Sequence, residues 1–242
     1  MFGSRRAQVV IASKGGNYTD PQGVWRKDFS GGYLKARVEE SLRRLNTGYI
    51  DLYQLHTPRS EEEFSQAMAN TETLDRLVEE GKLRAYGISI GPAGHGLRQI
   101  EHGYGATIQV VYNLLEREAE EKLLTEARRA NVGIIPRVPL AYGFLTGKYT
   151  RDVTFPESDH RSRMTAEQKK DWVEKADRLK PIAAELGISL SQLALQYLLA
   201  SPAVSVVIPG ARNESQARQN AAAGKLPPLP GDVLDRIRRA VA

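Results

Sequence analysis

Four polar side chains follow short apolar runs of the kind that form buried strands. Lys14 follows the run QVVIAS, His56 ends the run YIDLYQL, and Ser89 and Gln109 lie at or near the ends of two further runs. A lysine cation favours the ionised form of a nearby acid, and a neutral imidazole can donate a hydrogen bond to an oxygen that gains charge. Parallel strands of a barrel carry the active site at their carboxyl ends, so the four are expected to converge.

Each of these residues also has an interpretation without chemistry. A lysine after a strand is commonly a solvated turn residue, and a histidine such as His56 can be a core residue whose ring is satisfied by hydrogen bonds. Convergence of the four side chains at one end of a barrel would favour the functional interpretation.

The apolar runs alternate with helical patterns, which predicts βα units and a parallel sheet. Strands are predicted at Gln8–Ser13, Tyr49–Leu55, Arg84–Ile90, Thr107–Tyr112, Gly133–Val138 and Val204–Ile208. Amphipathic helices are predicted over 34–45, 64–78 and 118–130, the second behind a capping box of Ser60 and Glu63. After a polar loop at 151–162, further helices are predicted from Thr165, Ser189 and Glu214, and a last one at the end of the chain.

This pattern predicts a single α/β domain over residues 1–242, of the (β/α)8 TIM-barrel type but incomplete. A closed barrel needs eight strands, and about six are found. Either two strands are missing from the front, or the sheet is open and protected by a partner. Open edges favour self-association, so a homo-oligomer that covers them is predicted.

Composition narrows the function classes. The chain has no cysteine and a net charge of +5, and its positive charges are spread along the sequence, so no nucleic-acid role is predicted. It has no apolar run long enough for a membrane span and no signal peptide at its start. These features predict a cytoplasmic protein without a membrane role. The four histidines show no metal-ligand spacing, so no metal site is predicted.

Six motifs carry a resemblance to one enzyme family. IASKGG, LYQLHTP, GISIG, QVVYNLLERE, RVPLAYGFLTGKY and IPGARNESQARQN occur in the order and approximate spacing of the aldo-keto reductase superfamily, most like its bacterial branch. The resemblance covers essentially the whole chain, from the family's third strand onward. It implies a barrel whose first two βα units are absent from this chain.

In that family, a nicotinamide cofactor gives hydride to a carbonyl whose oxygen is protonated by a tyrosine. Lys14 matches the lysine that lowers the pKa of this tyrosine, and His56 matches the histidine that orients the carbonyl. The positions of the tyrosine and of the lysine's partner aspartate fall before Met1. Tyr18 and Asp20 resemble the family's substrate-side loop, and they are not predicted to replace the missing pair.

The resemblance also implies cofactor-binding residues. Ser89 and Gln109 match the groups that hold the nicotinamide carboxamide, with Ile90 where the family often has asparagine. Arg137 stands where many members place a tyrosine that stacks on the nicotinamide ring, and a planar guanidinium can stack as well. The pyrophosphate loop is matched by Pro139, Leu140, Gly143, Leu145, Gly147 and Lys148, and the adenosine end by Gly210, Arg212, Gln216 and Asn220. A guanidinium binds phosphate through two hydrogen bonds, so Arg212 favours NADPH (NADP+) over NADH.

The prediction is therefore an NADPH-dependent aldo-keto reductase-type oxidoreductase that acts reversibly on a small aldehyde, ketone or alcohol. Two explanations stay open for the absence of the first two βα units. In one, the sequence is a fragment of a normal enzyme or its start codon is misassigned. In the other, the truncation is real. A real truncation predicts a non-catalytic NADP(H)-binding protein, either a regulatory subunit or a scaffold stabilised by a partner. A third possibility is that the fold has been adapted to non-redox chemistry in which Lys14 and His56 take part.

Overall fold

The computed structural model describes residues 3–242, which form two compact units. The first unit comprises the chain up to Val110 together with Thr125–Ile134, and the second comprises Val111–Leu124 and Ile135–Ala242. The prediction of one domain over the whole chain stays a prediction. No single helix among the described residues is long and apolar enough to cross a membrane. One pair of helices, bent by 88°, meets that criterion on length and composition alone.

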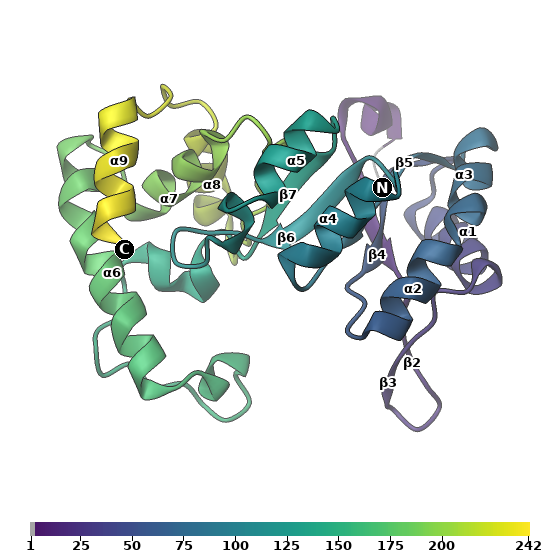
Figure 1. The fold of residues 1–242 in the computed structure, drawn as a ribbon, viewed down its shortest axis with the longest axis horizontal. Helices are drawn as coiled ribbons and strands as arrows, with labels where there is room; N and C mark the ends of the chain where they lie inside the picture. Colours follow the sequence, from purple (N-terminus) through teal and green to yellow (C-terminus); the bar gives the residue numbers. More distant parts are fainter. Residues whose placement is uncertain (1–2) are drawn as a thin grey trace. The chain divides into compact units, whose positions relative to one another are not determined.

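A sheet of five strands in the order β1-β4-β5-β6-β7 forms the framework of the first unit (Figure 1). Its strands are β1 (Ala12–Gly15), β4 (Ile50–His56), β5 (Leu83–Ser89), β6 (Thr107–Val111) and β7 (Gly133–Arg137). The pairs β1–β4, β4–β5 and β5–β6 are parallel, which confirms the α/β class. The last residues of β6 and β7 pass into the second unit.

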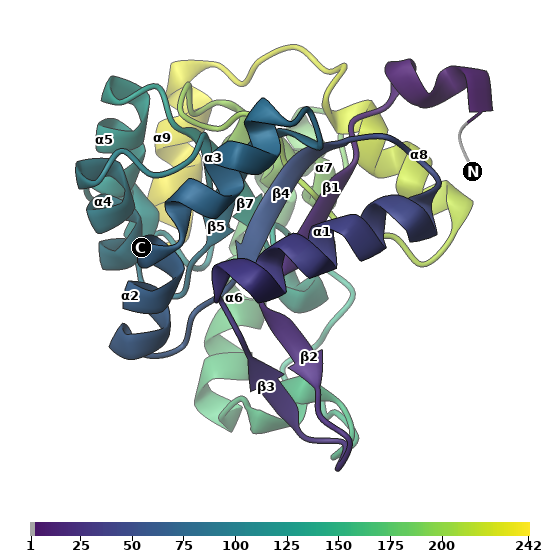
Figure 2. The same cartoon turned by 90° about the vertical axis from the view of Figure 1, so that its right-hand side faces the viewer.

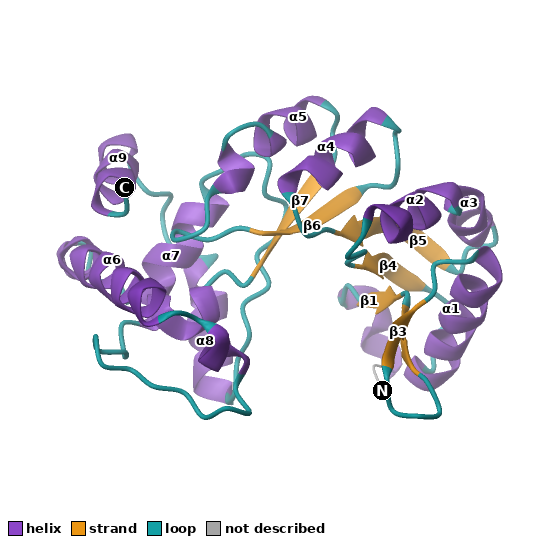
Figure 3. Cartoon of the chain, turned by 60° about the horizontal axis from the view of Figure 1, so that its bottom comes forward, coloured by secondary structure: helices purple, strands orange, loops and turns teal. Residues whose placement is uncertain are grey.

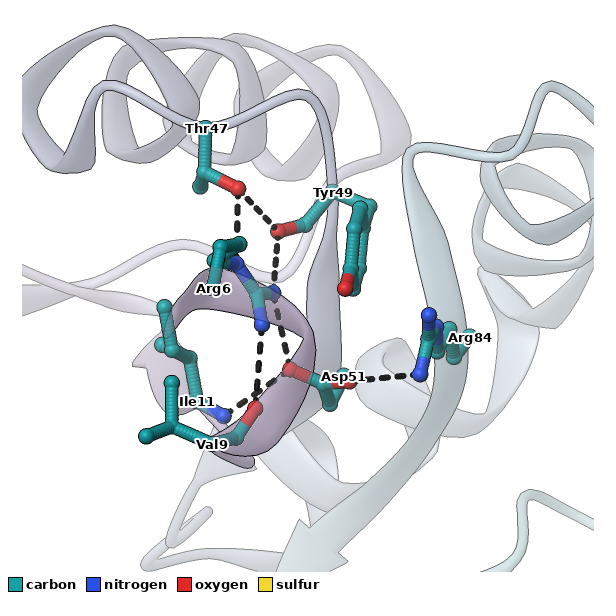
Figure 4. Close-up of polar contacts among 7 residues, drawn as sticks. All are labelled: Arg6, Val9, Ile11, Thr47, Tyr49, Asp51 and Arg84. Carbon is teal, nitrogen blue, oxygen red and sulfur yellow. Dashed lines mark hydrogen bonds and ion pairs between the residues drawn. The ribbon is translucent and has the colours of Figure 1, made fainter. Parts of the chain in front are cut away.

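The first strand begins later than the predicted Gln8–Ser13. Residues Gly3–Gln8 form a short 3-10 helix, and β1 starts only at Ala12. Backbone groups that a longer strand would use are hydrogen-bonded to side chains instead. The Arg6 guanidinium donates to the carbonyl of Val9, and the amide of Ile11 donates to the carboxylate of Asp51 (Figure 4). Specific side-chain bonds have thus overridden the β propensity of this segment.

A two-stranded antiparallel hairpin, which the sequence analysis did not predict, follows β1 directly (Figure 2). It consists of β2 (Asn17–Thr19) and β3 (Trp25–Lys27). Its turn is built on Asp20, whose Oδ1 accepts the amides of Gln22 and Val24 at 3.0 and 2.8 Å. The segment DPQG carries the residues that a type I turn favours, so this turn was a readable signal.

Glycine allows β1 to pack closely before the hairpin. A Cβ on Gly15 would lie 1.8 Å from the hydroxyl of Tyr53, and one on Gly16 would lie 2.2 Å from the ring of Phe29. Gly16 also has a backbone φ of +103°, which residues other than glycine rarely adopt. Glycine is therefore required at both positions by space, and at Gly16 by backbone conformation as well.

Helices cover the sheet of the first unit, and α1 extends across β1 and β4 (Figure 2). They are α1 (Gly31–Leu45), α2 (Glu61–Ala69), α3 (Thr71–Glu79), α4 (Ala93–Glu101) and α5 (Leu123–Arg129), of which α5 begins in the second unit. The predicted helix over 64–78 is split at Asn70, whose side chain accepts the amide of Gly31 at 2.9 Å. The predicted helix 118–130 is likewise two pieces, a 3-10 turn at Glu118–Glu120 followed by α5.

The second unit is helical after β7 (Figure 3). It contains 3-10 helices at Ala141–Thr146 and His160–Arg163, followed by α6 (Ala166–Glu185), α7 (Leu190–Leu199), α8 (Glu214–Ala223) and α9 (Gly231–Ala240). α6 packs against α7 and α9, and α7 packs against α8. Ser189, from which a helix was predicted, forms a reciprocal capping box with Gln192 at the start of α7. In the loop before α6, Arg161 binds Asp159 at 2.9 Å and lies 4.2 Å from the Phe155 ring centre.

The predicted strand Val204–Ile208 is wrong: no strand forms in the described chain after Arg137. Val206 and Ile208 are 46% and 42% exposed. A strand is stabilised by hydrogen bonds to a neighbour, and this segment makes no ladder with any described strand. The structure therefore has five parallel strands where six were predicted.

Candidate active site

Strand register brings Lys14, His56, Ser89 and Gln109 to one face of the sheet in the first unit. Lys14 pairs with Gln54, His56 pairs with Ser89, and Ser89 pairs with Gln109. Side chains two residues apart on a strand point to the same side, so Gln54 and His56 share this face. His56 and Ser89 end their strands and Lys14 is the last residue but one of β1, whereas Gln109 lies in the middle of β6. The arrangement is the one that the sequence spacing predicted.

The buried members of this face are joined by hydrogen bonds. The hydroxyls of Thr57 and Ser89 are 2.9 Å apart, and Nε2 of Gln109 donates to Oε1 of Gln54 at 3.1 Å. Ser89, Gln109 and Gln54 are only 1%, 4% and 1% exposed. Nε2 of Gln54 is buried and has no hydrogen-bond partner in the described part of the chain. An orphaned amide next to Gln109 fits a site that binds a polar group.

His56 is half-buried and contacts the hairpin. Nδ2 of Asn17 lies 2.8 Å from Nδ1 of His56. The Lys27 ammonium donates to Oδ1 of Asn17 and to the carbonyls of His56 and Thr57, at 3.0, 2.8 and 2.6 Å. Burial lowers the pKa of Lys27, while the Glu63 carboxylate opposes this shift. Lys14, in contrast, has an exposed side chain at the end of β1.

Three of these neighbours were missed by the sequence analysis. Gln54 could have been found, because it precedes His56 by two residues and strand alternation places it on the same face. Asn17 and Lys27 are ten residues apart, and only the hairpin register makes them partners. Nothing in the sequence pattern alone pairs them with His56.

In the second unit, the predicted pyrophosphate loop has an unusual backbone. Val138, Ala141 and Tyr142 have φ of 57°, 45° and 52°, and Gly143 and Gly147 also have positive φ. Non-glycine residues in this region store strain, which clusters at ligand-binding sites. Pro139 and Leu145 are buried, Leu140, Gly143 and Gly147 are half-buried, and Lys148 is exposed. Leu145 is fully buried in the core, so only its backbone could face a ligand.

The predicted adenosine-binding residues surround the start of α8. The Asn213 side chain caps the helix by accepting the amide of Gln216 at 2.9 Å. Oε1 of Gln216 accepts the amide of Arg212 at 2.8 Å, and Nδ2 of Asn220 donates to the carbonyl of Gly210 at 3.2 Å. Gln216 and Asn220 thus shape the turn, while Gly210 and Arg212 are exposed at the positive end of the helix dipole.

Arg137 ends β7 in the second unit and is half-buried. Its carbonyl accepts the amide of Tyr112 at 3.4 Å. Burial lowers the pKa of its guanidinium, and the charges of Tyr142 and Glu116 oppose that shift.

Each unit, taken by itself, thus carries groups of a kind that can bind part of a nicotinamide dinucleotide. The first has buried amide and hydroxyl groups at strand ends. The second has a strained backbone loop and a helix start with an exposed arginine, which suit phosphates. No cluster of three or more potential metal-binding side chains occurs among residues 3–242.

Comparison with known proteins identifies the family. The model of the aldo/keto reductase family matches residues 2–242. The chain belongs to the aldo/keto reductase family. It is 27% identical to the solved structure of a glycerol dehydrogenase from Gluconobacter oxydans, with a TM-score of 0.83 over 99% of this chain and 75% of that one. The family resemblance and the barrel-type α/β fold predicted from the sequence are therefore confirmed.

Three curated relatives show the range of the family. An uncharacterized oxidoreductase, YqkF of Bacillus subtilis, is 33% identical over 90% of this chain and 69% of its own length. A probable voltage-gated potassium channel subunit beta of Arabidopsis thaliana is 30% identical over 99% of this chain and 76% of its own length. An NADP(+) aldo-keto reductase, yakc of Schizosaccharomyces pombe, is 30% identical over 98% of this chain and 70% of its own length. Relatives of this chain thus include a nicotinamide-dependent reductase and a channel subunit.

Proposed function

We propose that this aldo/keto reductase family member binds NADP(H) and catalyses reversible hydride transfer to a small aldehyde or ketone. The observation that carries the proposal is the sheet face that Lys14, His56, Ser89 and Gln109 share on adjacent parallel strands, with Lys14, His56 and Ser89 at or next to carboxyl ends. In barrel enzymes this end of the sheet holds the active site.

Lys14 and His56 are the proposed catalytic residues. The Lys14 ammonium would favour the ionised form of a neighbouring proton donor and bring its pKa toward neutrality. The His56 imidazole would donate a hydrogen bond to the carbonyl oxygen as negative charge develops there. In the family a tyrosine donates the proton that converts the resulting alkoxide into the alcohol, and no residue of 3–242 is assigned that role.

Ser89 and Gln109 would hold the nicotinamide end of the cofactor, and Arg137 would stack on its ring. The strained loop at 138–148 would run along the pyrophosphate, and Arg212 would bind the 2′-phosphate that distinguishes NADPH from NADH. The bound cofactor supplies the hydride. The NADP(+) designation of the fission-yeast relative supports this choice.

A second candidate function is non-catalytic NADP(H) binding in a regulatory or scaffold role. The relative named as a potassium channel subunit beta, which matches 99% of this chain, favours it. This candidate predicts cofactor binding without turnover. It also predicts a partner, or a second copy of the chain, against the edge strand β1, where Val10 is 81% exposed.

Titration with NADPH, followed by the fluorescence of Trp25 and Trp172, tests both candidates. A generic aldehyde is then added and consumption of NADPH is recorded. Saturable binding with turnover is the result expected for the reductase. Binding without turnover would favour the regulatory candidate, and absence of binding by a folded chain would contradict both.

A further inference from the structure

The Lys27 ammonium has three hydrogen-bond acceptors in the first unit: Oδ1 of Asn17 and the carbonyls of His56 and Thr57. An ammonium has three N–H donors and no acceptor, so these contacts use its full capacity. Thr57 has φ +45°, which is rare for a β-branched residue. This backbone conformation allows two successive carbonyls to reach the same ammonium.

Lys27 therefore determines the orientation of the Asn17 amide. Lysine can only donate, so the atom of Asn17 that faces it must be the oxygen. The amide nitrogen is then the atom that lies 2.8 Å from Nδ1 of His56. A turned amide would place NH2 against the ammonium and lose a charge-assisted hydrogen bond.

The orientation of Asn17 in turn fixes the position of the proton on His56. The amide nitrogen of Asn17 donates, so Nδ1 of His56 must accept and carries no proton. In a neutral imidazole the proton then sits on Nε2. The charges of Glu63 and Arg59 act on Lys27 through space, the first raising and the second lowering the pKa of its ammonium.

The hairpin that supplies both residues is held in place independently. Asn17 and Lys27 are directly paired in its register. The Tyr33 hydroxyl donates to the carbonyl of Asn17 at 3.1 Å, and the amide of Asp28 donates to the carbonyl of Gly16 at 2.9 Å. At the far end, Arg26 binds the turn residue Asp20 at 2.9 Å.

We propose that Lys27 and Asn17 are positioning residues that hold His56 in the tautomer with its proton on Nε2. The proposal deepens, and rests on, the proposed function in which His56 donates to a substrate carbonyl. Lys27 acts through Asn17 and through the His56 and Thr57 carbonyls. The hydroxyl of Thr57 is bonded to that of Ser89, so the same cation also orders the strand end next to the proposed carboxamide site.

The test is the ¹⁵N NMR spectrum of the histidine side chains in the full chain. The spectrum of a His56→Phe variant assigns the His56 signals among the four histidines. The expected wild-type result is an unprotonated, pyridine-type shift at Nδ1 and a protonated, pyrrole-type shift at Nε2. A proton on Nδ1 in the wild type would overturn the proposal.

The decisive variant is Asn17→Asp, because an unconstrained imidazole already favours a proton on Nε2. The carboxylate can only accept, so Nδ1 should gain a proton and change to the pyrrole-type shift. Lys27→Met should broaden or average the His56 signals, because the Asn17 amide loses its fixed orientation. Lys35→Met, which removes an exposed lysine on α1, is the matched control and should leave them unchanged. An unchanged His56 spectrum in Asn17→Asp would contradict the proposal, provided that its circular dichroism shows a folded chain.

These spectra need neither cofactor nor substrate. Failure of the proposed reductase function would appear as absent turnover in the wild type, with the tautomer still measurable. Where the wild type turns over, Asn17→Asp should lower kcat at least about tenfold with an unchanged Kd for NADPH. An unchanged kcat would show that the tautomer has no role in catalysis.

Discussion

The guanidinium of Arg6 lies 2.8 Å from the carboxylate of Asp51, near the start of β4, whereas His56 ends the same strand. Arg6 also donates to Thr47 and to the carbonyls of Val9 and Tyr49, and Arg84 lies 3.1 Å from the other oxygen of Asp51 (Figure 4). Strand β4 thus joins a stabilising cluster at one end to the proposed chemistry at the other.

The Arg6–Asp51 cluster predicts a loss of stability without loss of cofactor binding. Asp51 is 9% exposed and holds the Ile11 amide as well as Arg6, so Asp51→Asn should lower the free energy of unfolding by about 2 kcal/mol. Urea denaturation measures this change. Asp171→Asn, which removes an exposed i,i+4 pair with Lys175, is the control and should cost less than about 0.5 kcal/mol.

The same carboxylate predicts a pH dependence. Burial raises the pKa of Asp51, but the Ile11 amide and the Arg6 guanidinium outweigh burial and hold the pKa below its usual range. Its stabilising contribution is therefore complete above the ordinary aspartate pKa of about 3.9 and is lost as the pH falls below it. The stability difference between wild type and Asp51→Asn should be constant from neutral pH to about pH 5 and then shrink. A constant difference down to the acid limit would refute this assignment.

Ser89→Ala should weaken NADPH binding if the Ser89 hydroxyl holds the carboxamide. Loss of one such hydrogen bond corresponds to about a fivefold to tenfold higher Kd. Thr57→Val removes only the Thr57–Ser89 hydrogen bond and leaves the Ser89 hydroxyl, so its Kd should change less. Fluorescence titration compares the two, and equal effects would argue against a direct role for Ser89.

Lys14→Met should remove turnover while retaining cofactor binding. Loss of the cation that tunes the proton donor should cost up to the about 10²–10⁴-fold in rate that general acid catalysis supplies. Lys14 is exposed on the strand, so the fold should tolerate the change. The comparison is kcat and the Kd for NADPH, with Lys35→Met as control. Full turnover in Lys14→Met would exclude Lys14 from the chemistry.

Arg212→Met should discriminate between the two nicotinamide cofactors. Loss of a guanidinium from the 2′-phosphate should raise the Kd for NADPH about tenfold and leave that for NADH unchanged. Arg218→Met, one turn or more further along α8 and paired with Glu214, is the control. Equal weakening of both cofactors would place Arg212 away from the 2′-phosphate.

Local signals predicted much of this fold. The end of β4 at His56, the start of β7 at Gly133 and the capping box at Ser189 were all readable, because alternation and capping act over a few residues. The break at Asn70 was not, because it depends on a hydrogen bond to Gly31, far away in the sequence.

The candidate site was predictable to the same extent. The residues at strand ends followed from spacing and from the family resemblance. Asn17 and Lys27 did not, because their role depends on tertiary hydrogen bonds to His56. The strand expected at Val204–Ile208 shows the opposite error: its apolar, β-branched sequence favours a strand, but the segment forms no strand and has a single bridge residue, Val204.

Transfer of deuterium from NADPH that carries deuterium at both C4 positions of the nicotinamide tests the central claim most directly. The chain is incubated with labelled NADPH and an aldehyde, and the alcohol is analysed by mass spectrometry. The reductase proposal predicts one deuterium on the carbinol carbon in the wild type and at least about 10²-fold less labelled alcohol with Lys14→Met. An unlabelled alcohol, or no alcohol from a chain shown to bind NADPH, would contradict it.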